Sequence, residues 1–185
     1  MINLNGSEFD GSNSNIKIFN GGTTGVARNV VGLRIERGTS PQPDFKFYFK
    51  DQNDAEINMG LYYVNETTET DKNKIKYGAK LKHLVHCYLG KDTKIPEMAT
   101  YKELTDWTIA QIEPLFNEVV VRLLVTYGTT QYPKAFIQVR GYVPFIEAES
   151  TPIGDSVLKL GDIDQKTRLV ADQPSVNSNV GSSVI

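Results

Sequence analysis

The sequence predicts a mainly β domain of five strands, with an insert of two helices between the third strand and the fourth. Two observations predict this fold class. Several short stretches alternate apolar and polar residues, which is typical of half-buried strands, and one central stretch places its apolar residues at helical spacing. The chain has 185 residues, of which 39% are hydrophobic and 23% are charged, as expected for one soluble domain with some tail.

The first three strands are expected in the first third of the chain. Alternation in GVARNVVGLRIER predicts a strand at about 26–37, and the Gly and two prolines of GTSPQPD predict a loop after it. FKFYFK at 45–50 alternates phenylalanine with Lys and Tyr. After the polar turn DQND, the stretch EINMGLYYV alternates through Ile57, Met59 and Leu61. Two alternating strands across a polar turn predict a β-hairpin.

A helical insert and two more strands follow the hairpin. A helix at about 77–89 is predicted by four apolar residues at i, i+3, i+4 and i+7: Leu81, Leu84, Val85 and Tyr88. A second helix is expected to begin near Thr100, because Thr100 and Glu103 have capping-box spacing, and to end at Pro114. NEVVVRLLVTY and AFIQVRGYVPF, joined by the loop GTTQYPK, predict the last two strands.

Five strands with a helix between the third and the fourth match the oligonucleotide/oligosaccharide-binding (OB) type of barrel, a five-stranded Greek-key barrel. An SH3-like barrel and a small α+β sheet remain alternatives, because strand order alone is not unique to one fold. We expect three regions: a flexible N-terminal arm at 1–15, the OB-type domain at 16–149 and a flexible C-terminal tail at 150–185. Both ends lack a sustained apolar period, which is typical of unpacked chain.

Composition and motifs exclude several classes of protein. The formal charge of −2 gives no whole-molecule attraction to nucleic acid or to an anionic membrane, so a basic function requires a local patch. A single cysteine, Cys87, rules out an internal disulfide. The chain shows neither a signal peptide nor an apolar run near the ~20 residues of a membrane helix, so we expect a soluble cytoplasmic protein that does not contact a membrane.

Catalytic and metal-binding motifs are also missing from the sequence. It contains neither GxSxG nor HExxH, so we expect a non-enzymatic protein without a cofactor. His83, His86 and Cys87 lie together on the predicted helix, but a structural zinc site requires four ligands and no second Cys/His pair exists. We expect Cys87 to pack as a small apolar side chain instead.

The outward side chains of the predicted strands combine aromatic rings with cations. If the phenylalanines of FKFYFK face the core, then Lys46, Tyr48 and Lys50 point outward. Tyr62 points outward from the partner strand. The other candidates come from the helix, the fourth strand, the loop GTTQYPK and the last strand: Lys80, Arg122, Tyr132, Lys134, Phe136, Arg140 and Tyr142. The lysine-rich stretch at 72–94, which includes Lys80, either follows a phosphate backbone or forms a solvated helix face.

Single-stranded nucleic acid requires this combination of side chains. Bases stack on aromatic rings whatever their identity, at ~1–3 kcal/mol per base, while Lys and Arg neutralise phosphates. The loops GTSPQPD and GTTQYPK join strands one to two and four to five, which are the loops that OB barrels use to grip oligonucleotides. Ordinary surface strands also favour aromatic residues and edge lysines, so a plain strand surface remains the alternative interpretation.

Four stretches of the body carry a resemblance: KIFNGGTTGVARNV, FKFYFKD, KLKHLVHCYLG and VTYGTTQYPKAFIQVRGYVPFIE. Over about 16–147 the chain resembles the single-stranded DNA-binding proteins encoded by bacteriophages, an OB-fold group. The resemblance implies a protein that coats exposed single strands during replication or recombination, without strong sequence preference, in the cytoplasm of the host cell.

The resemblance also implies phage replication proteins as partners. Many such proteins recruit replication enzymes through an acidic C-terminal tail. Here the segment from Thr151 balances four Asp with Lys159, Lys166 and Arg168 and has no acidic tip, so recruitment through the tail would need another chemistry. A homo-oligomer is compatible with this function. A viral structural or assembly protein with a β-barrel domain and a carbohydrate-binding module remain open as alternative functions.

Overall fold

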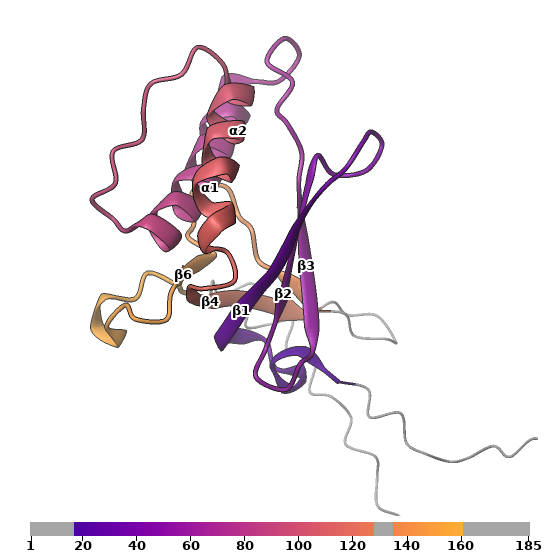
Figure 1. Ribbon diagram of the computed structural model, residues 1–185, viewed down its shortest axis with the longest axis vertical. Coiled ribbons are helices and arrows are strands. Elements are labelled where there is room, and N and C mark those ends of the chain that lie inside the picture. Colours follow the sequence, from indigo (N-terminus) through magenta and orange to yellow (C-terminus); the bar gives the residue numbers. More distant parts are fainter. Residues whose placement is uncertain (1–16, 128–134, 161–185) are drawn as a thin grey trace, which may run out of the picture.

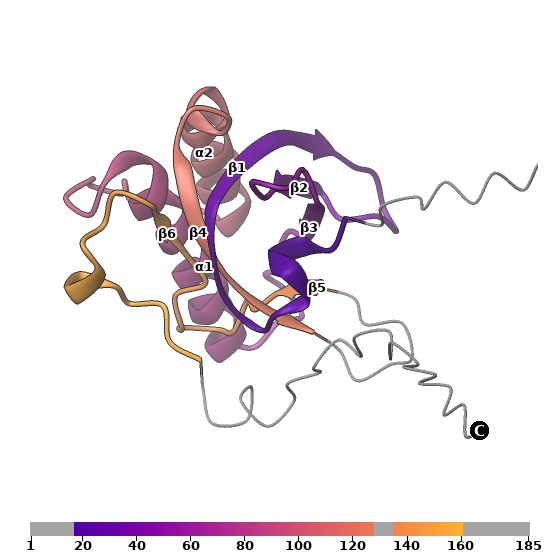
Figure 2. The ribbon, with the colours of Figure 1, turned by 90° about the horizontal axis from the view of Figure 1, so that it is seen from below.

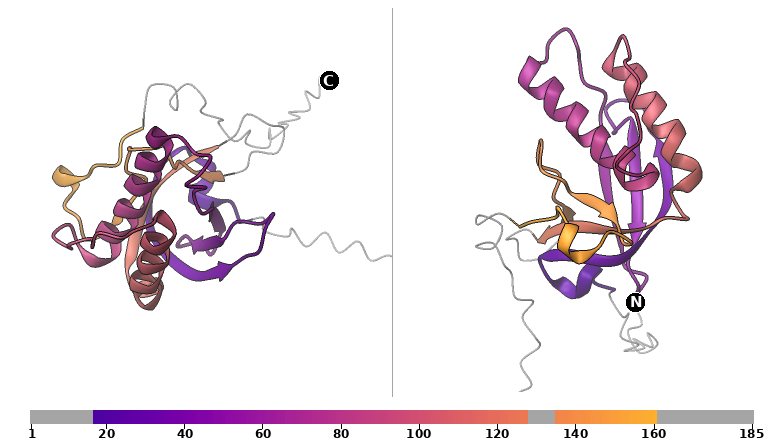
Figure 3. Two further views of the ribbon diagram at one scale, coloured as in Figure 1. Left: turned by 90° about the horizontal axis from the view of Figure 1, so that it is seen from above. Right: turned by 90° about the vertical axis from the view of Figure 1, so that its left-hand side faces the viewer.

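A strongly curved antiparallel sheet forms the body of the protein in the computed structural model, which describes residues 17–127 and 135–160 (Figure 1). The strands are β1 (Gly25–Arg37), β2 (Phe45–Lys50), β3 (Glu56–Leu61), β4 (Val120–Tyr127), β5 (Ala135–Ile137) and β6 (Ile146–Ala148). Between β3 and β4 the chain forms helices α1 (Asp71–Leu89) and α2 (Tyr101–Ile112), which lie side by side at one end of the sheet (Figures 1 and 3). Three short 3-10 helices are η1 (Phe19–Gly22), η2 (Glu113–Leu115) and η3 (Ile153–Asp155).

The sheet curls into a nearly closed barrel, and Figure 2 shows it from one open end. β1 pairs with β2 and β4, β2 pairs with β3, and β4 pairs with β5, all antiparallel, in the order β3-β2-β1-β4-β5. Because this path has an odd number of strands, its end strands β3 and β5 run in the same direction. They lie next to each other, and no backbone ladder joins them among the residues that the structure describes.

The long strand β1 bends around the barrel and appears as an arc in Figure 2. Its pairing register shifts between Ala27 and Val30 on the β4 side, and between Gly32 and Arg34 on the β2 side. Such bulges bend a strand and increase its twist. At the second bulge a Cβ on Gly32 would lie 2.2 Å from the carbonyl oxygen of Phe116, so only glycine fits there.

The phenylalanines of β2 form the centre of the core, which confirms the inward face predicted for FKFYFK. Phe45, Phe47 and Phe49 are at most 2% exposed. The ring of Phe116, which follows η2, packs on two of them, with ring centroids 5.9 Å from Phe47 and 5.1 Å from Phe49. The predicted inward residues of β3 are buried as well: Ile57, Met59 and Leu61.

Hydroxyl caps define where both helices begin. α1 starts at Asp71, earlier than the predicted 77, because the side chain of Thr70 accepts a hydrogen bond from the backbone N–H of Asn73. α2 begins after Thr100 as predicted, and Thr100 Oγ1 accepts from the backbone N–H of Glu103 at 3.1 Å. Both hydroxyl caps are local, and at α2 the carboxylate of Glu66 also accepts from the backbone N–H of Tyr101 at 2.7 Å, which adds a long-range contact to this helix start.

The last predicted strand, AFIQVRGYVPF, is interrupted in the structure. β5 and β6 both pair with β4, and the chain between them leaves the sheet and turns, with the Val143 N–H donating to the Arg140 carbonyl at 2.7 Å. Gly141 has a φ of +43°, which favours glycine, and Pro144 has no N–H to offer a ladder. The prediction of one continuous strand was therefore wrong, because these two residues divide it.

Contacts with the folded body also continue past the predicted start of the tail at 150. Leu158 is 7% exposed, and the hydroxyl of Ser156 donates to Glu147 at 2.6 Å. Ser156 and Leu158 therefore contact the body, while most side chains of 150–160 are exposed, and the boundary at 149 stays a prediction. The predicted arm at 1–15 and the rest of the tail lie outside the described residues. Within the described part of the chain, no helix combines the length and apolar character needed to cross a membrane.

Candidate nucleic-acid interface

The outer face of β2 carries Lys46, Tyr48 and Lys50, as the alternation predicts, and all three are partly exposed. The ring of Tyr48 is already engaged. The guanidinium carbon of Arg34, on β1, lies 3.8 Å from the ring centroid, and the Lys46 ammonium lies 5.0 Å from it. Both geometries are cation–π contacts. One side of the Tyr48 ring is therefore covered by a cation, which the sequence pattern of β2 alone did not reveal.

Acidic side chains offset the cations of this face. Glu36 binds Arg34 at 2.7 Å, and Asp54 binds Lys50 at 3.1 Å. The Arg34 guanidinium, with help from the Tyr48 hydroxyl, holds the pKa of Glu36 below its usual value, so this carboxylate stays ionised. Bonds from Lys50 and then Lys17 lower the pKa of Asp54 in the same way. The β2 face is thus aromatic and mixed in charge, rather than basic.

A second surface joins the end of β3 to α1. Tyr62, which is 56% exposed, lies at a hollow of about 190 Å³, hereafter the Tyr62–Lys80 hollow. Its walls come from β3, α1 and the segment after β5: Met59, Gly60, Leu61, Tyr62, Tyr77, Lys80, Leu84, Val139 and Phe145. Burial, and then the charge of Lys76, lower the pKa of Lys80, so an anion beside it would stabilise its charged form.

The chain between β5 and β6 extends this surface along α1. The position of Gly141 faces the side chain of Lys76, whose Cγ and Cδ would lie 3.4 Å from a Cβ built there. Tyr142 comes next and is 51% exposed, while Phe136 on β5 is 49% exposed. Arg140 is partly exposed. The structure therefore brings Tyr62 and Lys80 together in one hollow. It places Lys76 beside Gly141 and leaves Tyr142 outside the lining of that hollow. Lys76 lies on the same face of α1 as Lys80. The spacing of four residues between the two lysines predicts this shared face.

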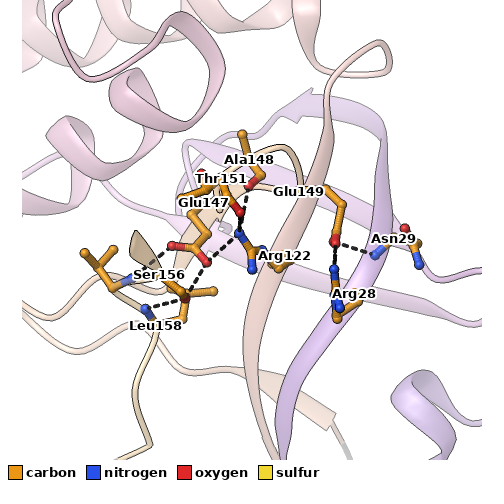
Figure 4. A network of polar contacts seen from close by, with 10 residues as sticks. Arg28, Asn29, Arg122, Glu147, Ala148, Glu149, Thr151, Ser156 and Leu158 are labelled. Atoms are coloured by element: carbon orange, nitrogen blue, oxygen red, sulfur yellow. Dashed lines mark hydrogen bonds and ion pairs between the residues drawn. The ribbon is translucent and has the colours of Figure 1, made fainter. Parts of the chain in front are cut away.

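Arg122 does not belong to this exposed surface. It is 3% exposed, and its Nη2 lies 3.2 Å from Glu147 and also donates to the carbonyl oxygens of Ala148 and Thr151 (Figure 4). The prediction that Arg122 points outward with the other cations was wrong. The partner Glu147 comes from β6, and the two side chains form a buried ion pair between β4 and β6.

Two predicted residues of the second loop, Tyr132 and Lys134, lie outside the described residues. The lysine-rich stretch at 72–94 forms most of α1 and the turn after it. Lys76 and Lys80 lean toward the body of the protein, whereas Lys72 and Lys82 are exposed. The stretch is thus partly a solvated helix face and partly the wall of the Tyr62–Lys80 hollow.

The histidines and the cysteine of α1 occupy apolar surroundings. The ring of His83 packs edge-on against Phe145 at 6.0 Å between centroids, and Cys87 is buried. Burial raises the pKa of the Cys87 thiol far above its usual value, so it stays protonated. Within 17–127 and 135–160, no group of three His, Cys, Asp or Glu side chains is arranged to hold a metal ion.

His83 should make stability depend on pH. Burial, with smaller contributions from His86 and Lys82, lowers the pKa of His83 to about 4, against an ordinary value of 6.5. Between these values the unfolded chain binds a proton that the folded chain does not, so the free energy of unfolding should fall as pH decreases through this window. Urea unfolding at several pH values should show the slope, and His83→Gln should reduce it. An unchanged slope in His83→Gln would contradict this assignment.

Comparison of the chain with known protein families, with curated proteins and with solved structures found no match. The chemistry of the two surfaces is therefore the basis for assigning a function.

Proposed function

We propose that this protein is a non-enzymatic single-stranded DNA-binding protein, which coats and protects single strands during DNA replication or recombination. In this proposal the barrel is of the OB type. The order β3-β2-β1-β4-β5, with β5 beside β3 and the helices inserted between β3 and β4, supports that connectivity. The resemblance to the bacteriophage proteins supports the same assignment.

One observation carries the proposal: the exposed ring of Tyr62 stands at a hollow that also contains the ammonium-bearing side chain of Lys80. A base can stack on the ring while its phosphate contacts Lys80, and Lys76 adds a second cation on the same helix face. In the chain from β5 to β6, Phe136 and Tyr142 offer two more exposed rings. These are the chemical requirements for binding a flexible single strand with little sequence preference.

The outer face of β2 forms the flank of the proposed interface rather than its centre. Arg34 covers one side of the Tyr48 ring, so a base at this place would stack on the guanidinium or displace it. Lys50 already binds Asp54, and a phosphate would have to compete with that carboxylate. Lys46 and Tyr48 therefore supplement the contacts of Tyr62 and Lys80.

Oligo-dT should bind the purified protein, and its affinity should fall as salt rises, with a slope of about −0.7 per phosphate contact. Tyr62→Ala should weaken binding about tenfold, since it removes a stacking ring worth ~1–3 kcal/mol. Tyr62→Phe, which keeps the ring, should retain binding.

Lys80→Gln should weaken binding and make the salt slope shallower by about 0.7. Fluorescence anisotropy across a salt series measures all four.

Lys159→Gln provides a matched control, because Lys159 is exposed and does not line the Tyr62–Lys80 hollow. It should leave the affinity within about twofold, since one distant surface charge is largely screened. Failure of the wild-type protein to bind oligo-dT at low salt would overturn the proposal. A large stable oligomer without affinity for oligonucleotides would favour the viral structural or assembly protein instead.

A further inference from the structure

A second and larger hollow lies on the other side of α1. It has a volume of about 1050 Å³ and runs between the C-terminal half of α1 on one side and β6 with the segment 150–157 on the other. Figures 1 and 3 show these segments facing each other at the edge of the molecule remote from β2 and β3. Its size exceeds what one small side chain or ion would need, and its length follows a helix and a strand.

The floor of this α1–β6 groove is apolar. The apolar part of its lining consists of aliphatic side chains and two prolines: Ala79, Val119, Pro144, Ile146, Ala148, Pro152 and Val157. Val157 is 44% exposed, so apolar surface remains open to solvent in the described structure. Tyr142 is the one exposed aromatic ring that lines it among the described residues. A floor of this kind suits aliphatic side chains better than a row of stacked bases.

Two buried polar atoms at the wall of the groove have no hydrogen-bond partner within the described chain. They are His83 Nδ1 and the hydroxyl oxygen of Tyr88. Tyr88 as a whole is 5% exposed. Both atoms are shielded from solvent, so a ligand in the groove would contact the exposed Ser150 in the lining rather than these atoms. A peptide backbone supplies both donors and acceptors at short intervals.

The charges at the groove favour an acidic ligand. Lys82 and Lys91 line it, and neither forms an ion pair among the residues that the structure describes. Glu147 is the one acidic residue in the lining, and its charge is already balanced by Arg122 at 3.2 Å. Asp92 acts on His86 from outside the lining. The accessible charge of the groove is thus positive, and positive charge at a rim steers negatively charged partners.

We infer that the α1–β6 groove binds a short segment of a partner protein that carries acidic and aliphatic side chains together. Aliphatic side chains would pack on the apolar part of the lining, carboxylates would approach Lys82 and Lys91, and backbone groups would bond to polar lining residues such as Ser150. The groove and the Tyr62–Lys80 hollow have no lining residue in common, although Tyr142 of the groove also belongs to the proposed DNA interface. This inference does not depend on the proposed function.

A library of random short peptides, displayed and selected on the full-length protein, tests the inference. Selected peptides should combine Asp or Glu with Leu, Ile or Val, and the enriched peptide should shift backbone amide NMR signals at 79–91 and 142–157. The double change Lys82→Glu with Lys91→Glu should weaken its binding about fivefold or more, since two attractions become repulsions. The matched double change Lys72→Glu with Lys94→Glu, at exposed positions outside the lining, should leave it unchanged.

Three outcomes would overturn the inference. No enrichment, or enrichment of peptides without acidic residues, would remove the acidic segment as the ligand. Amide shifts confined to the Tyr62–Lys80 hollow would place the peptide elsewhere. A dimer in sedimentation analysis that dissociates in Val157→Arg would show that a second copy of the chain covers the groove. Oligo-dT binding by the same variants is measured separately, so the result for the groove remains distinct from that for the DNA surface.

Discussion

Replacing Arg122 with alanine should lower the free energy of unfolding by about 3–5 kcal/mol, because it leaves the carboxylate of Glu147 buried without its cation. Glu147 is 6% exposed and would keep only its bonds from the Ser156 hydroxyl and the Val157 N–H. The carbonyl oxygens of Ala148 and Thr151 would lose a donor as well. Urea denaturation followed by circular dichroism measures the loss.

Arg28 provides the control for this effect, because Figure 4 shows it paired with Glu149 at the neighbouring strand, where the Arg28 side chain is 53% exposed. Arg28→Ala should cost at most about 1 kcal/mol. The double variant Arg122→Met with Glu147→Leu should recover most of the stability lost in Arg122→Ala, because it removes the buried charge together with its partner. A loss below about 1 kcal/mol in Arg122→Ala would contradict the buried ion pair.

Phe47→Ala should cost about 3–5 kcal/mol of unfolding free energy, since it removes a fully buried ring and leaves a cavity that the rigid sheet cannot fill. The ring lies between β2 and the Phe116 ring, so its loss also removes an aromatic contact. The same urea titration reports this change.

The adjacent residue gives a sharp comparison, because Tyr48 points to the opposite face of the same strand. Tyr48→Ala should cost about 1 kcal/mol or less, mostly the loss of its contact with Arg34. It should weaken oligo-dT binding only modestly. Equal destabilisation by Phe47→Ala and Tyr48→Ala would contradict the assignment of inner and outer faces.

Local patterns in the sequence predicted the parts of the fold that depend on near neighbours. The alternation in FKFYFK depends only on the two-residue period of a strand, and the start of α2 depends on Thr100 and Glu103, which are three positions apart. The interruption of the last strand also had a local signal, since Gly141 and Pro144 both disfavour a continuous ladder. The prediction of a continuous strand followed the apolar residues around Gly141 and Pro144 instead of these two residues.

Long-range contacts account for what the sequence did not predict. Arg122 looks like an exposed cation within an apolar run, and only its pairing with Glu147, brought in by β6, makes it a buried residue. Likewise, Glu36 and Asp54 neutralise the outer face of β2 from the adjacent strand and turn. Composition along one strand contains no information about which acid lies across from it. The meeting of Tyr62 with Lys80 has the same character, because it requires the packing of α1 on β3.

The join between β3 and β5 links the candidate DNA surface to the closure of the barrel. The end strands β3 and β5 lie next to each other without a backbone ladder among the described residues, so a separation at this join would leave the ladders of β1 intact. The Tyr62–Lys80 hollow lies across this join. Met59 to Tyr62 line it from the side of β3, and Val139, which follows β5, lines it from the other side. A ligand bound in the hollow would therefore contact both sides of the join and hold β3 and β5 together. Occupancy and closure would then form one linked equilibrium, in which each stabilises the other by the same free energy.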